Sequence, residues 1–108
     1  SYICQITAAI NGTIFKGAIN CSEVPATGDD DIDLYSATED DGAYDGLITD
    51  KTEVALVTAG GALAVGTLYP FTAFPTADDY LYLTSGNGDT AGTYSAGQIV
   101  IELWGYAS

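Results

Sequence analysis

Carboxylates are the side chains of this chain with the most obvious chemistry, and they are densest in one short run. Residues 29–33 read Asp-Asp-Asp-Ile-Asp, and oxygen ligands of this kind suit Ca²⁺. An EF-hand loop also needs glycine at its sixth position and glutamate at its twelfth, and the run that starts at Asp29 has neither. We therefore favour a solvated acidic loop, with a calcium site as the alternative.

Residues suited to catalysis are otherwise scarce. Histidine is absent, which removes the commonest general base and the commonest neutral metal ligand. Two cysteines cannot complete a Cys/His zinc site, and no Gly-x-Ser-x-Gly or P-loop motif occurs. Paired carboxylates can hydrolyse glycosides, but most acids lie in one stretch with nothing to separate their pKa values. We expect no enzymatic activity, no cofactor and no small-molecule substrate.

The net charge restricts the partners. Lys16 and Lys51 are the only basic residues, against 15 acids, for a net charge of −13. Binding to nucleic acid requires clustered basic side chains, and an anionic membrane attracts the same kind of cluster. We therefore expect neither partner. A protein interface on this chain must be uncharged or meet a basic surface.

The pattern along the chain is that of a β protein with one domain, residues 1–108. Runs of alternating or β-branched residues are separated by glycine, proline and asparagine turns. The predicted strands are residues 2–10, 13–21, 52–58, 62–69, 80–84 and 98–104, with shorter ones near residues 32–35 and 93–95. No stretch has a helical period of useful length. This predicts an all-β fold, a single antiparallel sandwich, jelly roll or small barrel of about seven to eight short strands.

The first two predicted strands are joined by Asn11-Gly12, the strongest short signal for a type I′ hairpin turn. A two-residue turn pairs residues 2–10 with residues 13–21. In that register Phe15 lies on a largely apolar face and Lys16 on the opposite, polar face.

The same register sets the relation between the two cysteines. Cys4 lies diagonally from Cys21 on one face, at a Cα separation of roughly 7–8 Å. Disulfides span about 4.4–6.8 Å, so a bulge or a longer turn would be needed to form one. The alternative, which we favour for a protein made in the cytosol, is two buried free thiols.

Residues 22–46 differ from the flanking segments because they are rich in carboxylates and contain Pro25, Gly28, Gly42 and Gly46. This composition predicts an acidic loop region. A short edge strand near residues 32–35 is expected within it, where charge would block stray strand pairing.

Aromatic side chains gather in the C-terminal third, which carries little charge. They form either a sugar-stacking platform or the packing of a core or subunit contact, and we favour the second. The candidate protein-contact residues are Tyr80, Tyr82, Tyr94, Trp104 and Tyr106.

Two segments in this part of the chain carry a resemblance to a known class of protein. "GALAVGTLYPFTAFPTADD" and "YLYLTSGNGDTAGTYSAGQIVIELWGY" resemble the C-terminal halves of small virion proteins of tailed bacteriophages, of the head decoration or minor capsid type. The likeness covers about residues 60–106. It consists of the strand-turn rhythm together with the Thr-Ala-Gly-Thr and Ala-Gly-x-Ile-Val-Ile patterns.

The resemblance implies a virion structural protein that is made in the host cytoplasm and binds the capsid surface. Its partners would be the major capsid protein and further copies of itself in a homo-oligomer. Two extracellular alternatives remain open. A secreted carbohydrate-binding module is favoured if tyrosine and tryptophan line an exposed groove. A filament subunit joined by strand exchange is favoured if residues 2–10 pair with a neighbour instead of with residues 13–21.

Overall fold

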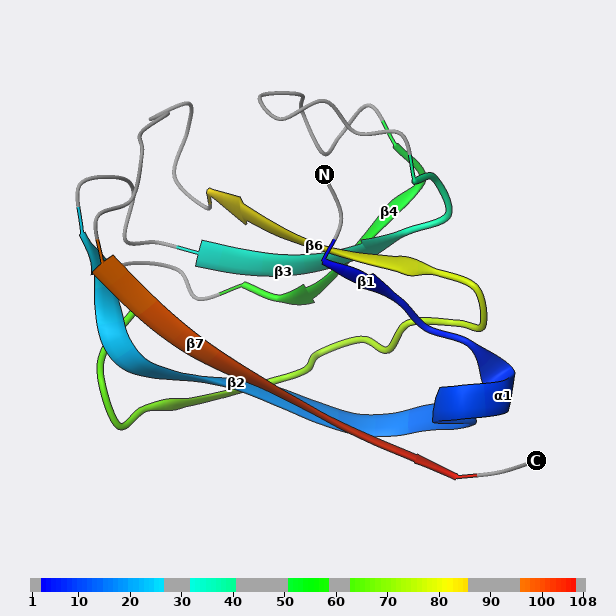
Figure 1. Cartoon of the computed structure of the whole chain (residues 1–108), viewed down its shortest axis with the longest axis horizontal. Coiled ribbons are helices and arrows are strands. Elements are labelled where there is room, and N and C mark those ends of the chain that lie inside the picture. The colour runs from blue at the N-terminus through cyan, green and yellow to red at the C-terminus, as the bar shows by residue number, and fades with distance from the viewer. Residues whose placement is uncertain (1–2, 27–31, 41–50, 59–62, 86–95, 107–108) are drawn as a thin grey trace.

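Two antiparallel sheets packed face to face make up the fold (Figure 1). A computed structural model of the chain describes residues 3–26, 32–40, 51–58, 63–85 and 96–106. Within these ranges the chain forms seven strands and one turn of helix. The prediction of an all-β sandwich is therefore confirmed.

One sheet has four strands, in the order β1-β6-β3-β4. Their bounds are Cys4–Gln5 for β1, Tyr80–Ser85 for β6, Ile32–Ala37 for β3 and Glu53–Val57 for β4. Every neighbouring pair is antiparallel. Leu34 in the central strand β3 lies opposite both Leu83 and Val57, so one row of aliphatic side chains crosses three strands.

The other sheet has three strands, in the order β5-β2-β7. Their bounds are Leu68–Pro70 for β5, Thr13–Ala26 for β2 and Ala96–Tyr106 for β7. The long strands β2 and β7 pair antiparallel over most of their length, with Lys16 opposite Trp104 and Ile19 opposite Ile101. This pair of strands forms the base of the molecule in Figure 1.

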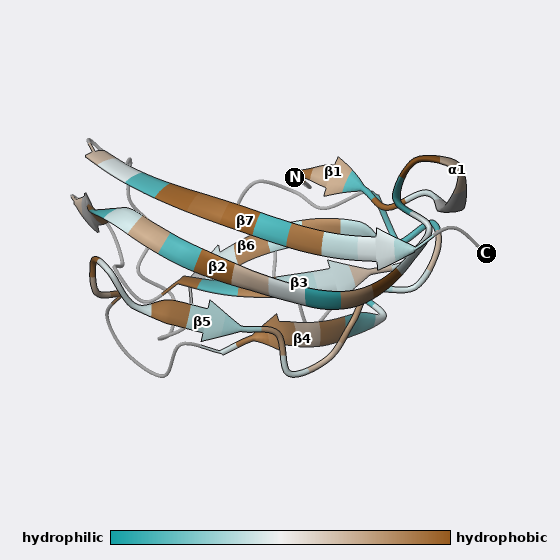
Figure 2. Cartoon of the chain, turned by 90° about the horizontal axis from the view of Figure 1, so that it is seen from below, coloured by the Kyte–Doolittle hydropathy of each residue, from teal (hydrophilic) through white to brown (hydrophobic). Residues whose placement is uncertain are grey.

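The core lies between the sheets because successive residues of a strand point to opposite faces. Figure 2 shows the resulting mixture of hydrophobic and hydrophilic positions along each strand. Each fully buried aliphatic side chain contributes about 1.5–3 kcal/mol of transfer free energy. The most completely buried large aliphatic residues are Ile6, Ile19, Leu34, Leu56 and Leu81.

The predicted N-terminal hairpin is wrong, because residues around Asn11-Gly12 end a helix instead of forming a turn. The helix α1, Ala8–Asn11, begins after Thr7, whose hydroxyl accepts a hydrogen bond from the Ile10 N–H. The helix ends at Asn11 and is followed by Gly12, whose φ of 65° is the left-handed conformation common after helices. Asn-Gly suits this role as well as a hairpin turn, and the helix carries the chain from one sheet to the other.

The two cysteines are consequently separated. Cys4 lies on β1 in the four-stranded sheet and is exposed, whereas Cys21 lies on β2 in the three-stranded sheet and is buried. Both are free thiols. The diagonal placement expected from the hairpin does not occur, since the two strands are not partners.

The predicted acidic loop at residues 22–46 is wrong where the chain forms strands. Strand β2 continues to Ala26, and β3 lies between β6 and β4 as a central strand instead of an edge. Hydrophobic burial outweighs the local charge there, because Ile32 and Leu34 face the core. Residues 27–31 and 41–46 of the predicted loop lie outside the described residues.

The strand predicted at residues 62–69 is also shorter than expected. Only Leu68–Pro70 forms a ladder, and Val65 makes a single parallel bridge to Cys21. Gly66 has a φ of 81°, which turns the chain between these two contacts. The short strand predicted near residues 93–95 lies outside the described residues.

Candidate functional site

Four of the five candidate contact residues are described, and they divide between the two sheets. Tyr80 and Tyr82 lie on β6 in the four-stranded sheet, and Trp104 and Tyr106 lie on β7 in the three-stranded sheet. Tyr94 lies outside the described residues. These four aromatic residues therefore do not form a single platform.

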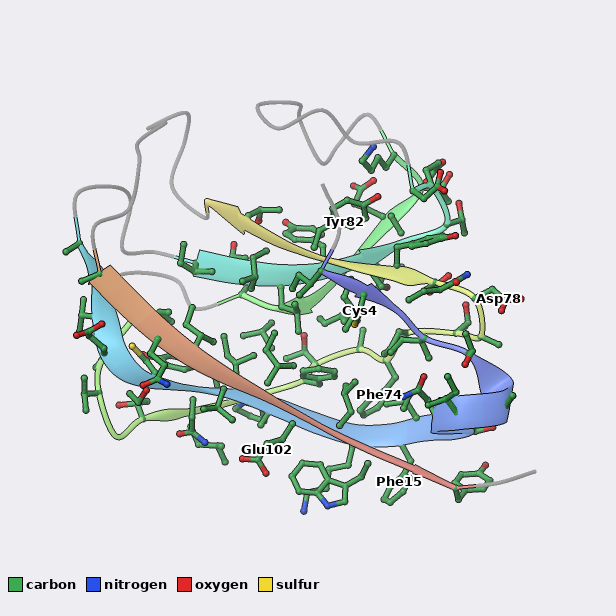
Figure 3. The ribbon with its side chains drawn as sticks, viewed as in Figure 1. Cys4, Phe15, Phe74, Asp78, Tyr82 and Glu102 are labelled. Carbon is green, nitrogen blue, oxygen red and sulfur yellow. The ribbon has the colours of Figure 1, made fainter. Side chains whose placement is uncertain are left out.

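The three-stranded sheet has an exposed outer face that combines aromatic and aliphatic side chains. Along β7, Ile99, Ile101 and Leu103 pack against the core, so the residues between them point outward. Figure 3 shows Phe15 and Glu102 on the side of the sheet away from the interior. The exposed members, here called the aromatic face, are Phe15, Lys16, Leu68, Val100, Trp104 and Tyr106.

Cross-strand pairing brings these side chains together from all three strands. Asn20 in the central strand β2 lies opposite Leu68 on one side and Val100 on the other. The exposed fractions of Leu68 and Val100 are 57% and 45%. Two exposed aliphatic side chains therefore flank Asn20 on the solvent side, where a sandwich ordinarily places polar residues.

At the other end of the face, the aromatic rings interact in two pairs. Lys16 Nζ lies 4.8 Å from the centroid of the Trp104 ring, a cation–π arrangement. The rings of Phe15 and Tyr106 are 5.9 Å apart and tilted by 45°. Phe15 and Lys16 are both exposed because the register of β2 against β7 shifts between Ile14 and Lys16.

The aromatic face carries little net charge. Lys16 is balanced by Glu102, which lies opposite Ala18 in the register. At the far end, the Glu23 carboxylate accepts a hydrogen bond of 2.8 Å from the Gly97 N–H. In a chain of net charge −13, this surface can be desolvated at a much lower cost than an acidic one.

The outer face of the four-stranded sheet is covered instead. Tyr82 is only 4% exposed, and its hydroxyl donates a hydrogen bond to the Glu39 carbonyl oxygen. Lys51 Nζ lies 5.6 Å from the centroid of the same ring. The structure thus places Tyr82 in the packing of this chain, and half-buried Tyr80 precedes it on the same strand.

Carboxylates determine the electrostatics of this covered face. The Glu39 carboxylate accepts hydrogen bonds from the Thr52 N–H and hydroxyl, at 2.8 and 2.9 Å, and these bonds hold its pKa below the usual value. Tyr35 lies opposite Tyr82. Burial raises the pKa of the Tyr35 phenol, and the negative charges of Asp33 and Glu53 add to this effect.

Some members of the aromatic face were not among the sequence candidates. Phe15 was expected on the apolar side of a hairpin, and the register shift beside it has no signature in the sequence. Val100 could have been found, since the alternation from Gln98 to Tyr106 places it on the same side as Trp104. Leu68 could not, because its partner strand is distant in the sequence.

Among the described residues, no group of three or more histidine, cysteine or acidic side chains is placed to hold a metal ion. Of the four aspartates at residues 29–33, Asp33 alone is described, and it is buried on β3. No helix in the described ranges has the length and apolar character needed to cross a bilayer.

Comparison with known proteins adds no identification. No family model matches the chain, and no curated protein or solved structure matches it significantly. The resemblance to phage virion proteins therefore stays a prediction from the sequence.

Proposed function

We propose that this protein is a non-enzymatic structural component of a virion, which binds the assembled major capsid protein through its aromatic face. The observation that carries the proposal is the contrast between that face and the rest of the chain. Trp104, Tyr106 and Phe15 are 38%, 55% and 51% exposed on one surface with balanced charge, whereas the whole chain has a net charge of −13.

The composition of the face is that of a protein interface. Interface cores are depleted in charged residues and enriched in tyrosine, tryptophan and phenylalanine. Tryptophan and tyrosine dominate binding energy where they are surrounded by contacts that exclude water. Lys16 lies over the Trp104 ring and other exposed side chains flank it on β7, so a docked partner would surround the ring in this way.

The capsid surface is proposed as the partner on the strength of the resemblance over residues 60–106. That segment includes β5 and β7, two of the three strands that form the aromatic face. The acidic remainder of the chain would face solvent or basic residues of the shell, and its charge would discourage unspecific self-association.

A carbohydrate-binding module is the second candidate, because Trp104 and Tyr106 are exposed on one side of the same strand. A sugar platform needs accessible ring faces in a common plane. Lys16 already lies over the Trp104 ring, and the rings of Phe15 and Tyr106 are tilted by 45°. These contacts favour docking to protein over stacking on a flat polysaccharide.

Co-sedimentation with capsids tests the proposal. The purified chain is mixed with shells of the virus that carries it, stripped of the native copies, and with unassembled capsid protein. We expect binding to shells alone, and at least a tenfold loss of affinity for Trp104→Ala. The matched control is Ile10→Ala, which removes an 85% exposed apolar side chain on α1, outside the aromatic face.

Two results would overturn the proposal. One is equal shell binding by the Trp104→Ala and Ile10→Ala variants, since the aromatic face would then have no role. The other is a soluble monomer that ignores shells and binds a polysaccharide on a glycan array. That result would establish the carbohydrate-binding alternative.

A further inference from the structure

The edge strands of the sandwich differ in how well they are protected against pairing with another strand. In the described sheets the edges are β1, β4, β5 and β7. Strand β1 has two residues, β5 has three and ends at Pro70, and β4 has five with a register shift in its pairing. Short length, proline and bulges are the usual protections of an edge.

Strand β7 is long, and the extra residues at the three register shifts in its pairing with β2 lie on β2. Strand β7 has 11 residues and contains neither proline nor lysine. At about 3.4 Å per residue it extends over roughly 35 Å. On an edge strand, alternate N–H and C=O groups point away from the sheet, where a further strand can bind them.

The C-terminal end of β7 lies against α1. A side chain at Gly105 would overlap the carbonyl oxygen of Asn11 at the end of α1, so the helix approaches β7 there as closely as the backbone allows. Among the other described elements, β7 pairs with β2 alone. The part of the edge farther from α1, residues 96–103, is the part that an added strand would use.

The core beside this edge is incompletely covered. Ile99 and Ile101 face the core but are only half-buried. On the facing sheet, Leu83 is 40% exposed although Leu81, on the same side of β6, is 1% exposed. The described residues of β1 pair with Tyr80 and Leu81. Figure 2 shows β1 and β7 on the same side of the sandwich.

The net charge of the chain favours a basic segment as the added strand. A second copy of the chain would bring another net charge of −13 against the first, which opposes association. A basic segment would be attracted instead, and Glu102 on β7 offers a carboxylate beside the edge. Apolar residues on its inward side would cover Ile99 and Ile101.

We propose that the free edge of β7 accepts an extended segment of another protein, with basic residues alternating with aliphatic ones, as an additional strand of the three-stranded sheet. Backbone hydrogen bonds along residues 96–103 provide the attachment, as in other complexes formed by strand addition. This site uses the backbone edge of β7 and shares Val100 with the aromatic face, but it does not depend on the proposed capsid function, because the peptide test needs no shells.

The probe for this edge is a nine-residue peptide in which lysine alternates with isoleucine. Calorimetry measures its affinity, and amide hydrogen exchange followed by NMR locates it. We expect exchange of outward-pointing amides in residues 96–103 to slow at least tenfold. Two control peptides are the same sequence N-methylated at every backbone amide and a peptide with all lysines before all isoleucines. Each should bind at least tenfold more weakly.

A matched pair of variants tests the position. Val100→Lys and Leu68→Lys each replace an exposed aliphatic side chain of the aromatic face with lysine, on β7 and β5 respectively. Both change the net charge equally. We expect Val100→Lys to weaken peptide binding at least tenfold and Leu68→Lys to change it less than twofold, while both reduce shell docking.

Three results would overturn the proposal. Equal binding of the N-methylated peptide would show that charge alone holds the probe. Unchanged exchange of the β7 amides would place the peptide elsewhere. Slowed exchange of these amides with rising protein concentration and no peptide would show that a second copy occupies the edge. If Val100→Lys fails to fold, the peptide comparison still decides the question on the unaltered chain.

Discussion

The outer faces of the two sheets have the same residue types, but one face buries them and the other exposes them. Each has an aromatic ring beneath a lysine ammonium, Tyr82 beneath Lys51 and Trp104 beneath Lys16. Tyr82 is 4% exposed and Trp104 is 38% exposed. Tyr82 donates a hydrogen bond from its hydroxyl to the Glu39 carbonyl oxygen, and among the described residues the exposed ring of Trp104 makes no such bond. An aromatic ring on an outer face is thus part of the fold where residues of the same chain bury it and available to a partner where they do not.

The charges follow the same division. On the covered face, burial raises the pKa of Tyr35, and the charges of Asp33 and Glu53 add to this effect. The Glu39 carboxylate accepts a hydrogen bond from the Thr52 N–H. The open face has Lys16 and Glu102 in balance. A covered face can accommodate carboxylates that are hydrogen-bonded, whereas a surface that docks to protein must lose its water at low cost.

Truncation of the covered ring should have the largest effect on stability. Tyr82→Ala removes a buried aromatic side chain and leaves a cavity, which we expect to lower the free energy of unfolding by about 3–5 kcal/mol. Urea denaturation measures the change. Tyr82→Phe is the control that keeps the ring and removes only the hydroxyl bond to Glu39, at about 1 kcal/mol. Equal losses for Tyr82→Ala and Tyr106→Ala would contradict the distinction between the faces.

Truncation of the open ring should have a smaller effect on stability and a larger one on docking. Trp104→Ala is expected to lower the free energy of unfolding by about 1–2 kcal/mol, because the ring is partly exposed before the change. Circular dichroism follows unfolding in this variant. In the unaltered chain Trp104 is the sole tryptophan, so its fluorescence should be quenched by acrylamide when free and protected on docking. A loss above about 3 kcal/mol would mean that the ring belongs to the core.

The smallest effect concerns pH. Because the pKa of Glu39 is lowered in the folded chain, the stability it contributes is present above its ordinary value of 4.5 and is lost as pH falls through the lowered pKa. We expect the Thr52 amide resonance in NMR spectra to shift in that acidic range, while the Trp104 indole resonance does not. In Glu39→Gln the Thr52 shift should disappear. A Thr52 shift of the same size in that variant would assign the titration to another group.

Strand positions are the part of the fold that local pattern predicts well. Residues 52–58 and 80–84 were predicted as strands, and the structure has Glu53–Val57 and Tyr80–Ser85. The prediction of a strand at 98–104 is likewise confirmed by Ala96–Tyr106. Each run has β-branched or aromatic residues with flanking turn residues, and these features act over a few positions.

Prediction from local sequence failed in two situations. In one, the same residues suit two different structures; in the other, the burial of aliphatic side chains outweighs the charge of their neighbours. Asn11-Gly12 suits a hairpin turn and a helix end alike, and α1 is too short to show a helical period. Residues 32–37 follow an acidic run, yet they form the centre of a sheet because their aliphatic side chains reach the core. The choice between a turn and a helix end, and the choice between a loop and a central strand, both depend on what packs against the segment.

The candidate site shows the same limit. Alternation along the predicted strand at residues 98–104 places Val100 and Trp104 on one side, and composition predicts few charges in this part of the chain. Only the tertiary structure decided that this side faces solvent, that β2 contributes Phe15 and Lys16 beside it, and that Tyr82 is covered. The physical reason is that alternation specifies relative direction within a strand, whereas exposure depends on contacts between segments distant in the sequence.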